Sequence, residues 1–148
     1  MKALQLSNFG ASNLSLVDIA LSEPRDHEVV VRLKAASLNP RDSQIIAGQF
    51  TTAVDFPLTP LSDGAGTVIA VGAAVTRFDV GDNVTTLFFP NWYSGEATAG
   101  ERAVSTGLEV SGSAREAGIF HEDSLALSAP HLSAAEAACY PCAGLTAW

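Results

Sequence analysis

The two cysteines of the sequence, Cys139 and Cys142, are separated by two residues. This Cys-x-x-Cys spacing can serve a dithiol redox site or half of a zinc site. A redox pair is activated at a helix N-terminus that follows a strand, whereas Cys139 lies late in an alanine-rich stretch. Zinc would need two further ligands, and the histidines, His27, His121 and His131, show no paired spacing. The pattern favours buried structural cysteines, with a redox pair or a former catalytic position as the alternatives.

A second candidate is Gly64-Ala65-Gly66, because Gly-x-Gly fragments can let a backbone approach the pyrophosphate of a dinucleotide. A working fingerprint follows a strand, opens a helix and carries a third glycine three positions after the second. Here that third position is Ile69, and the residues after Gly66 favour a strand. The pattern therefore favours glycines that permit a bulge or close packing of backbones in a barrel.

The segment Asn39-Pro40-Arg41-Asp42 places two polar side chains beside a cation, between a predicted strand and a short helix. Its composition alone favours a capped turn, in which Asp42 stabilises the start of the helix through the helix dipole. The histidines are isolated in the sequence and indicate no nucleophile and base arrangement. His27 begins a strand and His131 precedes a helix cap, which favours solvated or capping roles.

The elements that must position these residues are mostly strands as far as Leu87. Alternating patterns or apolar, β-branched runs predict strands over residues 2–6, 14–19, 27–36, 67–71 and 83–87. The run at residues 67–71 is almost entirely apolar, which predicts a strand buried on both faces. Pro40–Gly48 begins with proline and ends with glycine, which predicts a helix of one or two turns.

The types and spacing of the residues change in the second half of the chain. Residues 90–113 hold small and polar residues with sporadic apolar anchors, which predicts a long irregular lobe or loop. Strand patterns resume over residues 115–120 and 124–127. Ser133-Ala134-Ala135-Glu136 is a capping box that opens an alanine-rich helix, which Pro141 should end or kink. The apolar end at Trp148 has no polar tail, from which we expect a truncated chain.

Composition limits the class of protein. A chain of 148 residues with 47% hydrophobic and 16% charged residues has the size and composition of one folded domain. Its net charge is −8 and its eight Lys and Arg residues are scattered, which argues against a nucleic-acid partner. The longest apolar run is about half of the roughly 20 residues that span a bilayer, and no signal-type run follows the start. We therefore expect a cytoplasmic chain with no membrane partner and no disulfide framework.

The order of several segments resembles the N-terminal, GroES-like alcohol dehydrogenase domain of the medium-chain dehydrogenase/reductase superfamily. These segments are Glu28–Arg32 with Ala35–Asp42, Pro60–Val68, Val71–Val84, and Leu132–Ala138 with Pro141–Trp148. The resemblance runs through nearly the whole chain except residues 90–113, and its Val71–Val84 segment is highly specific. It implies a mainly β fold with short helices: a partly open, GroES-like β-barrel over residues 1–132. A helix over residues 133–148 would then lead toward a Rossmann cofactor domain that is missing from this chain.

Departures from the family pattern indicate a branch. Zinc-dependent members carry a cysteine where this chain has Asn39, and a Gly-His-Glu triplet at or beside Ser62-Asp63-Gly64. Cys142 aligns with a third zinc ligand, but a catalytic zinc needs about three protein ligands. The cysteine run of the structural zinc lobe is also absent from the sequence. The resemblance is therefore to the zinc-independent, quinone-oxidoreductase-like branch, and we expect no metal.

In that branch the Asn-Pro-x-Asp segment lines the cleft near the nicotinamide. The resemblance therefore implies catalytic, positioning roles for Asn39 and Asp42, in place of the capped turn. It also implies cofactor contacts from Asn39 and Thr146.

The implied substrate cleft includes Phe50, Asp63 and Cys142. Phe50 stands where the branch often has tyrosine, which removes a hydroxyl donor from that position. The expected protein is the substrate-side part of an NADPH- or NADH-dependent oxidoreductase that acts on quinones, activated carbonyls or alcohols. We expect it to be inactive as an isolated fragment and a homodimer in full-length form.

Two rival functions stay open from the sequence. A GroES-like barrel can be a binding or assembly module without chemistry, which the acidic charge and apolar end would suit. A thiol oxidoreductase would need a lowered thiol pKa at Cys139 or Cys142. A Gly-x-Gly-x-x-Gly motif after a strand, within a few dozen residues downstream of Trp148, would favour the dehydrogenase.

Overall fold

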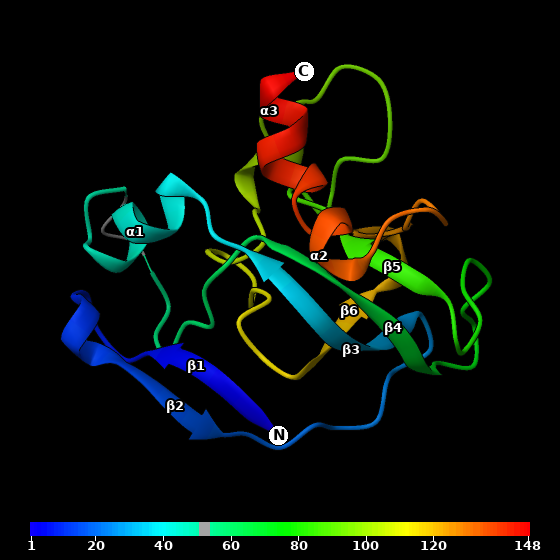
Figure 1. Cartoon of the computed structure of the whole chain (residues 1–148), viewed down its shortest axis with the longest axis horizontal. Helices are drawn as coiled ribbons and strands as arrows, with labels where there is room; N and C mark the ends of the chain where they lie inside the picture. The colour runs from blue at the N-terminus through cyan, green and yellow to red at the C-terminus, as the bar shows by residue number, and fades with distance from the viewer. Residues whose placement is uncertain (51–53) are drawn as a thin grey trace.

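Two antiparallel sheets and several short helices build the chain in a computed structural model that describes residues 1–50 and 54–148 (Figure 1). The strands are β1 (Lys2–Leu6), β2 (Leu14–Asp18), β3 (Glu28–Ser37), β4 (Asp63–Val71), β5 (Asn83–Thr86), β6 (Ala117–His121) and β7 (Leu125–Leu127). The helical segments are η1 (Ala11–Asn13), α1 (Pro40–Ile46), η2 (Glu101–Ala103), η3 (Glu122–Ser124), α2 (Ala134–Ala137), η4 (Tyr140–Gly144) and α3 (Leu145–Ala147). Of these, η4 is a π-helical turn, and η1, η2 and η3 are short 3-10 turns.

The strands divide between a small sheet and a large one. β1 pairs with β2, and the other five strands are ordered β6-β3-β4-β5-β7. The small sheet is joined to the rest by backbone hydrogen bonds, from Leu4 N–H to the Ala114 carbonyl and in both directions between Leu6 and Leu58, at 2.8–2.9 Å. This arrangement confirms the predicted mainly β, partly open fold. No helix in residues 1–50 and 54–148 has the length and apolar character needed to cross a membrane.

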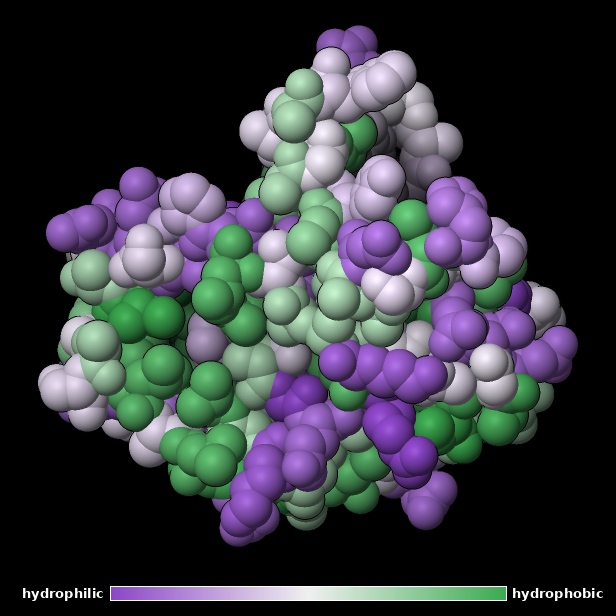
Figure 2. All heavy atoms as spheres, in the orientation of Figure 1, coloured by the Kyte–Doolittle hydropathy of each residue, from purple (hydrophilic) through white to green (hydrophobic). Residues whose placement is uncertain are grey.

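The core lies on the inner face of the large sheet. Its buried side chains are Val29, Val31, Val68, Phe78, Val84, Phe120 and Leu125. Alternation along β3 places Val29 and Val31 on this face, as their spacing in the sequence predicts. A second apolar cluster lies between β1 and α1, around Leu6 and Ile45. Apolar side chains also reach the surface over this region, at the left of Figure 2.

Strand β4 differs from its prediction in both length and burial. It begins at Asp63, so Gly64-Ala65-Gly66 lies inside the strand rather than ahead of it. The expectation of burial on both faces over residues 67–71 is wrong, because only Val68 of these residues is fully buried, and the most buried part of β4 is its start. A β-carbon on Gly66 would lie 2.1 Å from the Arg32 carbonyl oxygen, and the β3–β4 register shifts between Leu33 and Ala35. Gly66 therefore has the predicted structural role of close backbone packing beside a bulge, whereas a β-carbon on Gly64 would meet the Ser113 side chain.

The C-terminal helix starts as predicted and then changes pitch. Ser133 N–H donates to Glu136 Oε2 at 2.8 Å and Glu136 N–H donates to Ser133 Oγ at 3.3 Å, which confirms the capping box. The α-helix ends at Ala137, and the chain continues through Pro141 as the wider turn η4, followed by α3. This segment stands out from the body of the molecule at the top of Figure 2, and its last residue, Trp148, is fully exposed.

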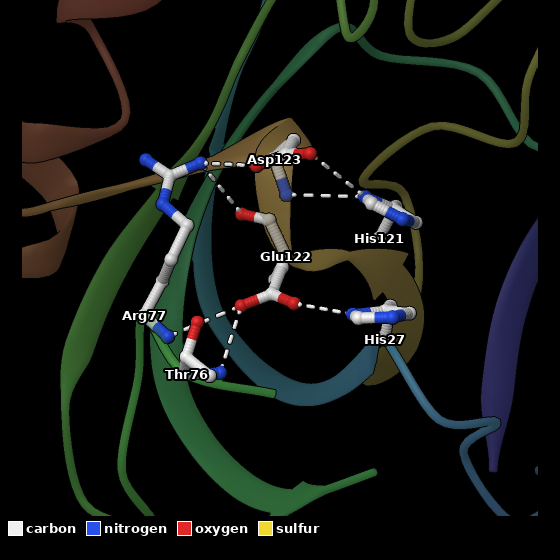
Figure 3. A network of polar contacts seen from close by, with 6 residues as sticks. All are labelled: His27, Thr76, Arg77, His121, Glu122 and Asp123. Carbon is white, nitrogen blue, oxygen red and sulfur yellow. Dashed lines mark hydrogen bonds and ion pairs between the residues drawn. The ribbon is translucent and has the colours of Figure 1, made fainter. Parts of the chain in front are cut away.

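Glu122 joins three segments that lie far apart in the sequence (Figure 3). Its carboxylate is almost fully buried. Oε2 accepts hydrogen bonds from the backbone N–H groups of Thr76 at 2.9 Å and Arg77 at 3.1 Å. Oε1 lies 2.8 Å from Nδ1 of His27. The start of β3, the loop before Phe78 and η3 are therefore held together by one carboxylate.

The two histidines nearest to Glu122 are neighbours in space although they are isolated in the sequence. The rings of His27 and His121 stack with their centroids 5.9 Å apart. His121 Nδ1 accepts a hydrogen bond from the backbone N–H of Asp123 at 3.2 Å, which caps η3. The sequence spacing does not indicate this pairing, which arises because β6 places His121 beside the start of β3.

Replacing Glu122 with glutamine should lower the free energy of unfolding by about 2 kcal/mol at pH 7, the scale of hydrogen bonds to a charged group. The backbone N–H of Thr76, followed by the His27 contact, lowers the pKa of Glu122 to about 2, from an ordinary value of 4.5. The stabilisation is therefore complete above about pH 4.5 and is lost as the pH falls toward 2.

Urea unfolding at pH 7 and pH 2.5 checks this prediction. The difference between the wild-type chain and Glu122→Gln should shrink at the lower pH. Glu96→Gln, at an exposed carboxylate in the lobe, is the control and should change stability little at either pH. An equal loss at both pH values for Glu122→Gln would contradict the assigned role of the charge.

Candidate functional site

The polar segment between β3 and α1 forms the capped turn that its composition predicts. Asn39 is the N-cap residue of α1 and Pro40 is its first residue. The backbone N–H of Asn39 donates to Asp42 Oδ2 at 2.8 Å. Both side chains are buried, with 8% of Asn39 and 3% of Asp42 exposed. Burial raises the pKa of Asp42, which the Asn39 hydrogen bond opposes. Asp42 therefore fixes the backbone of Asn39.

Asp63, the first residue of β4, fixes the side chain of Asn39. It is fully buried, at 0% exposure. Its Oδ2 accepts hydrogen bonds from Asn39 Nδ2 at 2.9 Å and from the backbone N–H of Cys142 at 3.2 Å. Burial raises the pKa of Asp63, and the Asn39 and Cys142 hydrogen bonds oppose the rise. One carboxylate oxygen thus joins the start of α1 to the π-helical turn η4.

The chain around Asp63 is held from both sides. Leu61 adopts a left-handed backbone conformation with φ of 74°, which costs a non-glycine residue about 1–2 kcal/mol. The Leu61 carbonyl accepts a hydrogen bond from Ser113 N–H at 2.7 Å. On the other side, Thr86 Oγ1 accepts from Gly64 N–H at 2.9 Å and donates to the Ser62 carbonyl at 3.0 Å. These contacts direct the Asp63 side chain toward Asn39.

An apolar pocket of about 450 Å³ lies beside this polar cluster. It is lined by Leu87, Phe88, Phe89, Trp92, Pro141, Cys142, Leu145 and Thr146. One wall is the chain that leaves β5, and the other is formed by η4 and α3, which run close to the lobe loop in Figure 1. None of the described residues that line the pocket is charged. The pocket can therefore take an uncharged, apolar molecule.

The structure brings together most of the residues expected at the site. Asn39, Asp42, Asp63 and Cys142 form one connected group, and Cys142 and Thr146 line the pocket. Asn39, Asp42 and Asp63 do not line the pocket; all three are buried, and Cys142 is the residue that contacts both Asp63 and the pocket. Phe50 is 51% exposed and lies against Arg41 rather than in the pocket lining.

The expectation of two buried cysteines is wrong. Cys139 is exposed, and its thiol contacts the Ala135 carbonyl at 3.3 Å within the helix. Cys142 is partly buried. Burial and the nearby charge of Asp63 raise the pKa of the Cys142 thiol. A thiol oxidoreductase needs the opposite shift, so Cys142 is unsuited to that role.

Arg41 also contributes to the candidate site, although no pattern in the sequence assigns it a role. Its Nη1 donates to the Thr106 carbonyl at 3.1 Å and its Nη2 to Ser105 Oγ at 2.9 Å. Its guanidinium carbon lies 4.5 Å from the centroid of the Phe88 ring and 5.3 Å from that of Phe50. The partners Ser105 and Thr106 are 64 and 65 residues further along the chain, so no local pattern indicates them.

Comparison with known proteins identifies relatives of this chain. The family model of the alcohol dehydrogenase GroES-like domain matches residues 25–131. A zinc-type alcohol dehydrogenase-like protein of Schizosaccharomyces pombe is 38% identical over 121 residues, which are 82% of this chain and 35% of that protein. A chloroplastic quinone-oxidoreductase homologue of Spinacia oleracea is 33% identical over 151 residues, covering 99% of this chain and 40% of that protein.

The fold agrees with these sequence relatives. The crystal structure of an NAD-dependent alcohol dehydrogenase matches with a TM-score of 0.85 at 34% identity, covering 100% of this chain and 45% of that one. The chain spans less than half the length of each of these relatives. The match in sequence over β3 to β7, together with the match in fold, shows that the chain belongs to the alcohol dehydrogenase GroES-like domain family of the medium-chain dehydrogenase/reductase superfamily.

Proposed function

We propose that this chain forms the substrate side of a zinc-independent, NAD(P)H-dependent oxidoreductase that acts on quinones, activated carbonyl compounds or alcohols. The observation that supports this most is the uncharged pocket between residues 87–92 and 141–146, joined through Cys142 to the Asp63 oxygen that orients Asn39. An apolar, water-poor pocket with a few fixed polar groups suits a small neutral acceptor. The quinone-oxidoreductase homologue and the NAD-dependent alcohol dehydrogenase among the relatives support the same reaction class.

In this proposal the nicotinamide cofactor supplies the hydride, and the chain supplies orientation. Asn39 uses Nδ2 to bind Asp63, and its amide oxygen, which faces the Asp42 backbone N–H in the capping box, has a second lone pair that is proposed to accept from a donor on cofactor or substrate. The Thr146 hydroxyl is a polar group of the pocket lining and is proposed to contact the cofactor. Asp42 and Asp63 are positioning residues, because each acts through Asn39.

A cofactor domain outside this chain is part of the proposal. A dinucleotide is held chiefly by a glycine-rich turn at a helix N-terminus. Gly64 and Gly66 lie inside β4, and a β-carbon on Gly66 would already meet the backbone of β3, so this pair leaves no room for a pyrophosphate. We therefore place nucleotide binding mainly in a separate domain.

The donor set around Cys142 supports independence from zinc. The Asn39 amide points an N–H toward Asp63, whose Oδ2 already accepts two hydrogen bonds. The Cys142 thiol has a raised pKa, whereas zinc binds thiolate. Across the described ranges 1–50 and 54–148, no three His, Cys, Asp or Glu side chains are grouped so that they could hold a metal ion. These groups do not fit a catalytic zinc, which needs about three protein ligands.

Turnover and metal analysis test the proposal, because the name of the fission-yeast relative makes zinc the obvious competing cofactor. The chain joined to its cofactor domain should oxidise NADPH or NADH with a naphthoquinone acceptor, at a rate that chelation leaves unchanged. Protein purified without a metal-binding tag should contain far less than one zinc per chain. One tightly held zinc per chain, or loss of the rate on chelation, would contradict zinc independence.

Calorimetric titration of residues 1–148 alone tests whether the nucleotide is bound mainly by a separate domain. We expect no measurable NADPH binding to the isolated chain. Micromolar affinity would show that this chain holds the dinucleotide by itself.

A further inference from the structure

We propose that Arg41 and Thr106 form a clasp that holds the aromatic wall of the apolar pocket, and that the clasp determines which acceptors fit. This inference rests on the proposed function in taking the pocket as the acceptor site. The wall is the segment Leu87–Trp92, which follows β5 and lies outside the sheet. The Leu87 N–H still donates to the Ser124 carbonyl at 2.9 Å beside the end of β7, so beyond this bond the position of the wall must be set by contacts other than strand pairing.

Thr106 supplies two of those contacts. Its Oγ1 donates to the Leu87 carbonyl at 2.8 Å, and its backbone N–H donates to the Phe88 carbonyl at 3.0 Å. Thr106 is itself buried, so these bonds are shielded from water. Two successive carbonyls of the wall are thereby fixed by one residue of the lobe.

Arg41 supplies a third contact to the wall and supports Thr106. Its guanidinium lies over the Phe88 ring, and its Nη1 donates to the Thr106 carbonyl, so Arg41 contacts both the wall and the other residue of the clasp. Phe88 in turn packs edge to face on Phe89, with ring centroids 4.7 Å apart. Both of these rings line the pocket. A displacement of Arg41 would therefore pass to both phenyl groups.

The clasp also connects the wall to the polar side of the site. Arg41 lies two residues after Asn39 on the same short helix. Ser105, which precedes Thr106 and also contacts Arg41, is anchored within the lobe. Its N–H and its hydroxyl both donate to Glu109 Oε2 at 2.8 Å. Helix α1 thus sets the Asn39 amide and, through Arg41, the wall that faces η4 and α3. The separation of these parts limits the thickness and width of an acceptor.

Probe binding to residues 1–148 tests the clasp without any turnover assay. Trp148→Phe serves as the background, which leaves Trp92 of the wall as the single tryptophan. The measurements are the Kd of the neutral fluorescent probe N-phenyl-1-naphthylamine and the acrylamide quenching of Trp92. Arg41→Met keeps an unbranched stem but removes the guanidinium and its donors, and Thr106→Val removes the hydroxyl while keeping shape. Arg102→Met is the control, because Arg102 is an exposed arginine of the lobe whose Nη1 donates to the nearby Ala97 carbonyl.

We expect the Kd of the probe to rise about tenfold in Arg41→Met and several-fold in Thr106→Val, because these variants lose one or two buried hydrogen bonds. Acrylamide should quench Trp92 more strongly in both variants than in the background. The double variant should show less than the product of the single effects, because both residues act on one segment. Arg41→Lys should recover only part of the loss, because an ammonium lacks the planar fork. Arg102→Met should stay within about twofold of the background.

Unchanged Kd and quenching in Arg41→Met would overturn the clasp. So would an equal change in Arg102→Met, or effects of Arg41→Met and Thr106→Val that simply multiply. If circular dichroism shows that Arg41→Met is unfolded, Thr106→Val decides whether the clasp holds the wall, because this substitution preserves side-chain volume. If the background chain does not bind the probe, the acceptor pocket of the proposed function is wrong, whereas the quenching of Trp92 still decides whether the clasp holds the wall.

Discussion

Replacement of Asn39 with alanine is expected to lower the turnover of the proposed oxidoreductase, with the chain joined to a cofactor domain, by about a hundredfold, the scale for removal of one oriented polar group from a reaction centre. In the structure the Asn39 amide is fixed by Asp63, and its backbone is fixed by Asp42. Alanine removes the amide and leaves the buried Asp63 oxygen with one of its two donors. Steady-state rates with NADPH and a naphthoquinone, with kcat and KM determined separately, measure the effect.

Two further variants make this result specific. Asp42→Ala should also lower turnover, because the N-cap backbone of Asn39 loses its partner. Arg102→Ala, in the peripheral lobe, should leave turnover within about twofold. Thermal unfolding of each variant separates a loss of activity from a loss of folded protein. If Asn39→Ala and Asp42→Ala both keep wild-type turnover, the pair only caps α1.

Replacement of Gly66 with alanine is expected to destabilise the chain by about 3 kcal/mol or more, at the upper end of the range for overpacked interiors. The new β-carbon would lie 2.1 Å from the Arg32 carbonyl oxygen and 2.9 Å from Leu33 Cα. Both atoms belong to the backbone of β3, so no side-chain rotation relieves the contact. A loss of this size lowers the melting temperature by roughly 10 °C in a chain of this length, which calorimetry detects.

Gly100→Ala is the matched control for Gly66→Ala. Gly100 has a helical backbone with φ of −67°, and no atom lies within 4 Å of its added β-carbon. Alanine there should be neutral or should stabilise the chain by about 0.5 kcal/mol, because it restricts the unfolded chain. Equal stability of Gly66→Ala and Gly100→Ala would show that β3 and β4 do not approach as closely as described.

Local patterns in the sequence predict most of the elements correctly. The alternation in Lys2–Leu6 and the Pro and Gly positions around α1 are signals within a few residues, and the corresponding elements begin where they are predicted. The family resemblance indicates the residues of the polar cluster, because it carries information that no single segment holds. Its assignment of Asn39 and Asp42 stays compatible with the capped turn, since backbone and side chain of Asn39 bind different carboxylates.

The contacts that complete the site connect distant residues and are not visible in local patterns. Cys142 N–H reaches Asp63 across 79 residues, and His27 reaches Glu122 across 95. The π-helical turn was not predicted, because helix signals describe repeating i to i−4 bonds and Pro141 indicates only a stop or a kink. In the structure the N–H of Cys142, immediately after that proline, finds its acceptor in the buried Asp63 carboxylate.

The turn η4 also makes this part of the chain sensitive to length. A π-helical turn holds about one residue more than an α-helical turn, so it behaves as a single-residue insertion. Deleting one residue between Tyr140 and Gly144 would remove that extra residue and restore regular pitch, and the residues beyond would keep nearly the same orientation, because four α-helical residues cover about one turn as the five residues of η4 do. Leu145 and Thr146 would then still face the pocket, but the wide turn that brings the Cys142 N–H to Asp63 would be lost. Exchange of the exposed Ala143 would keep the wide turn and this hydrogen bond, so among descendants of this sequence we expect substitutions here to persist and deletions to be eliminated.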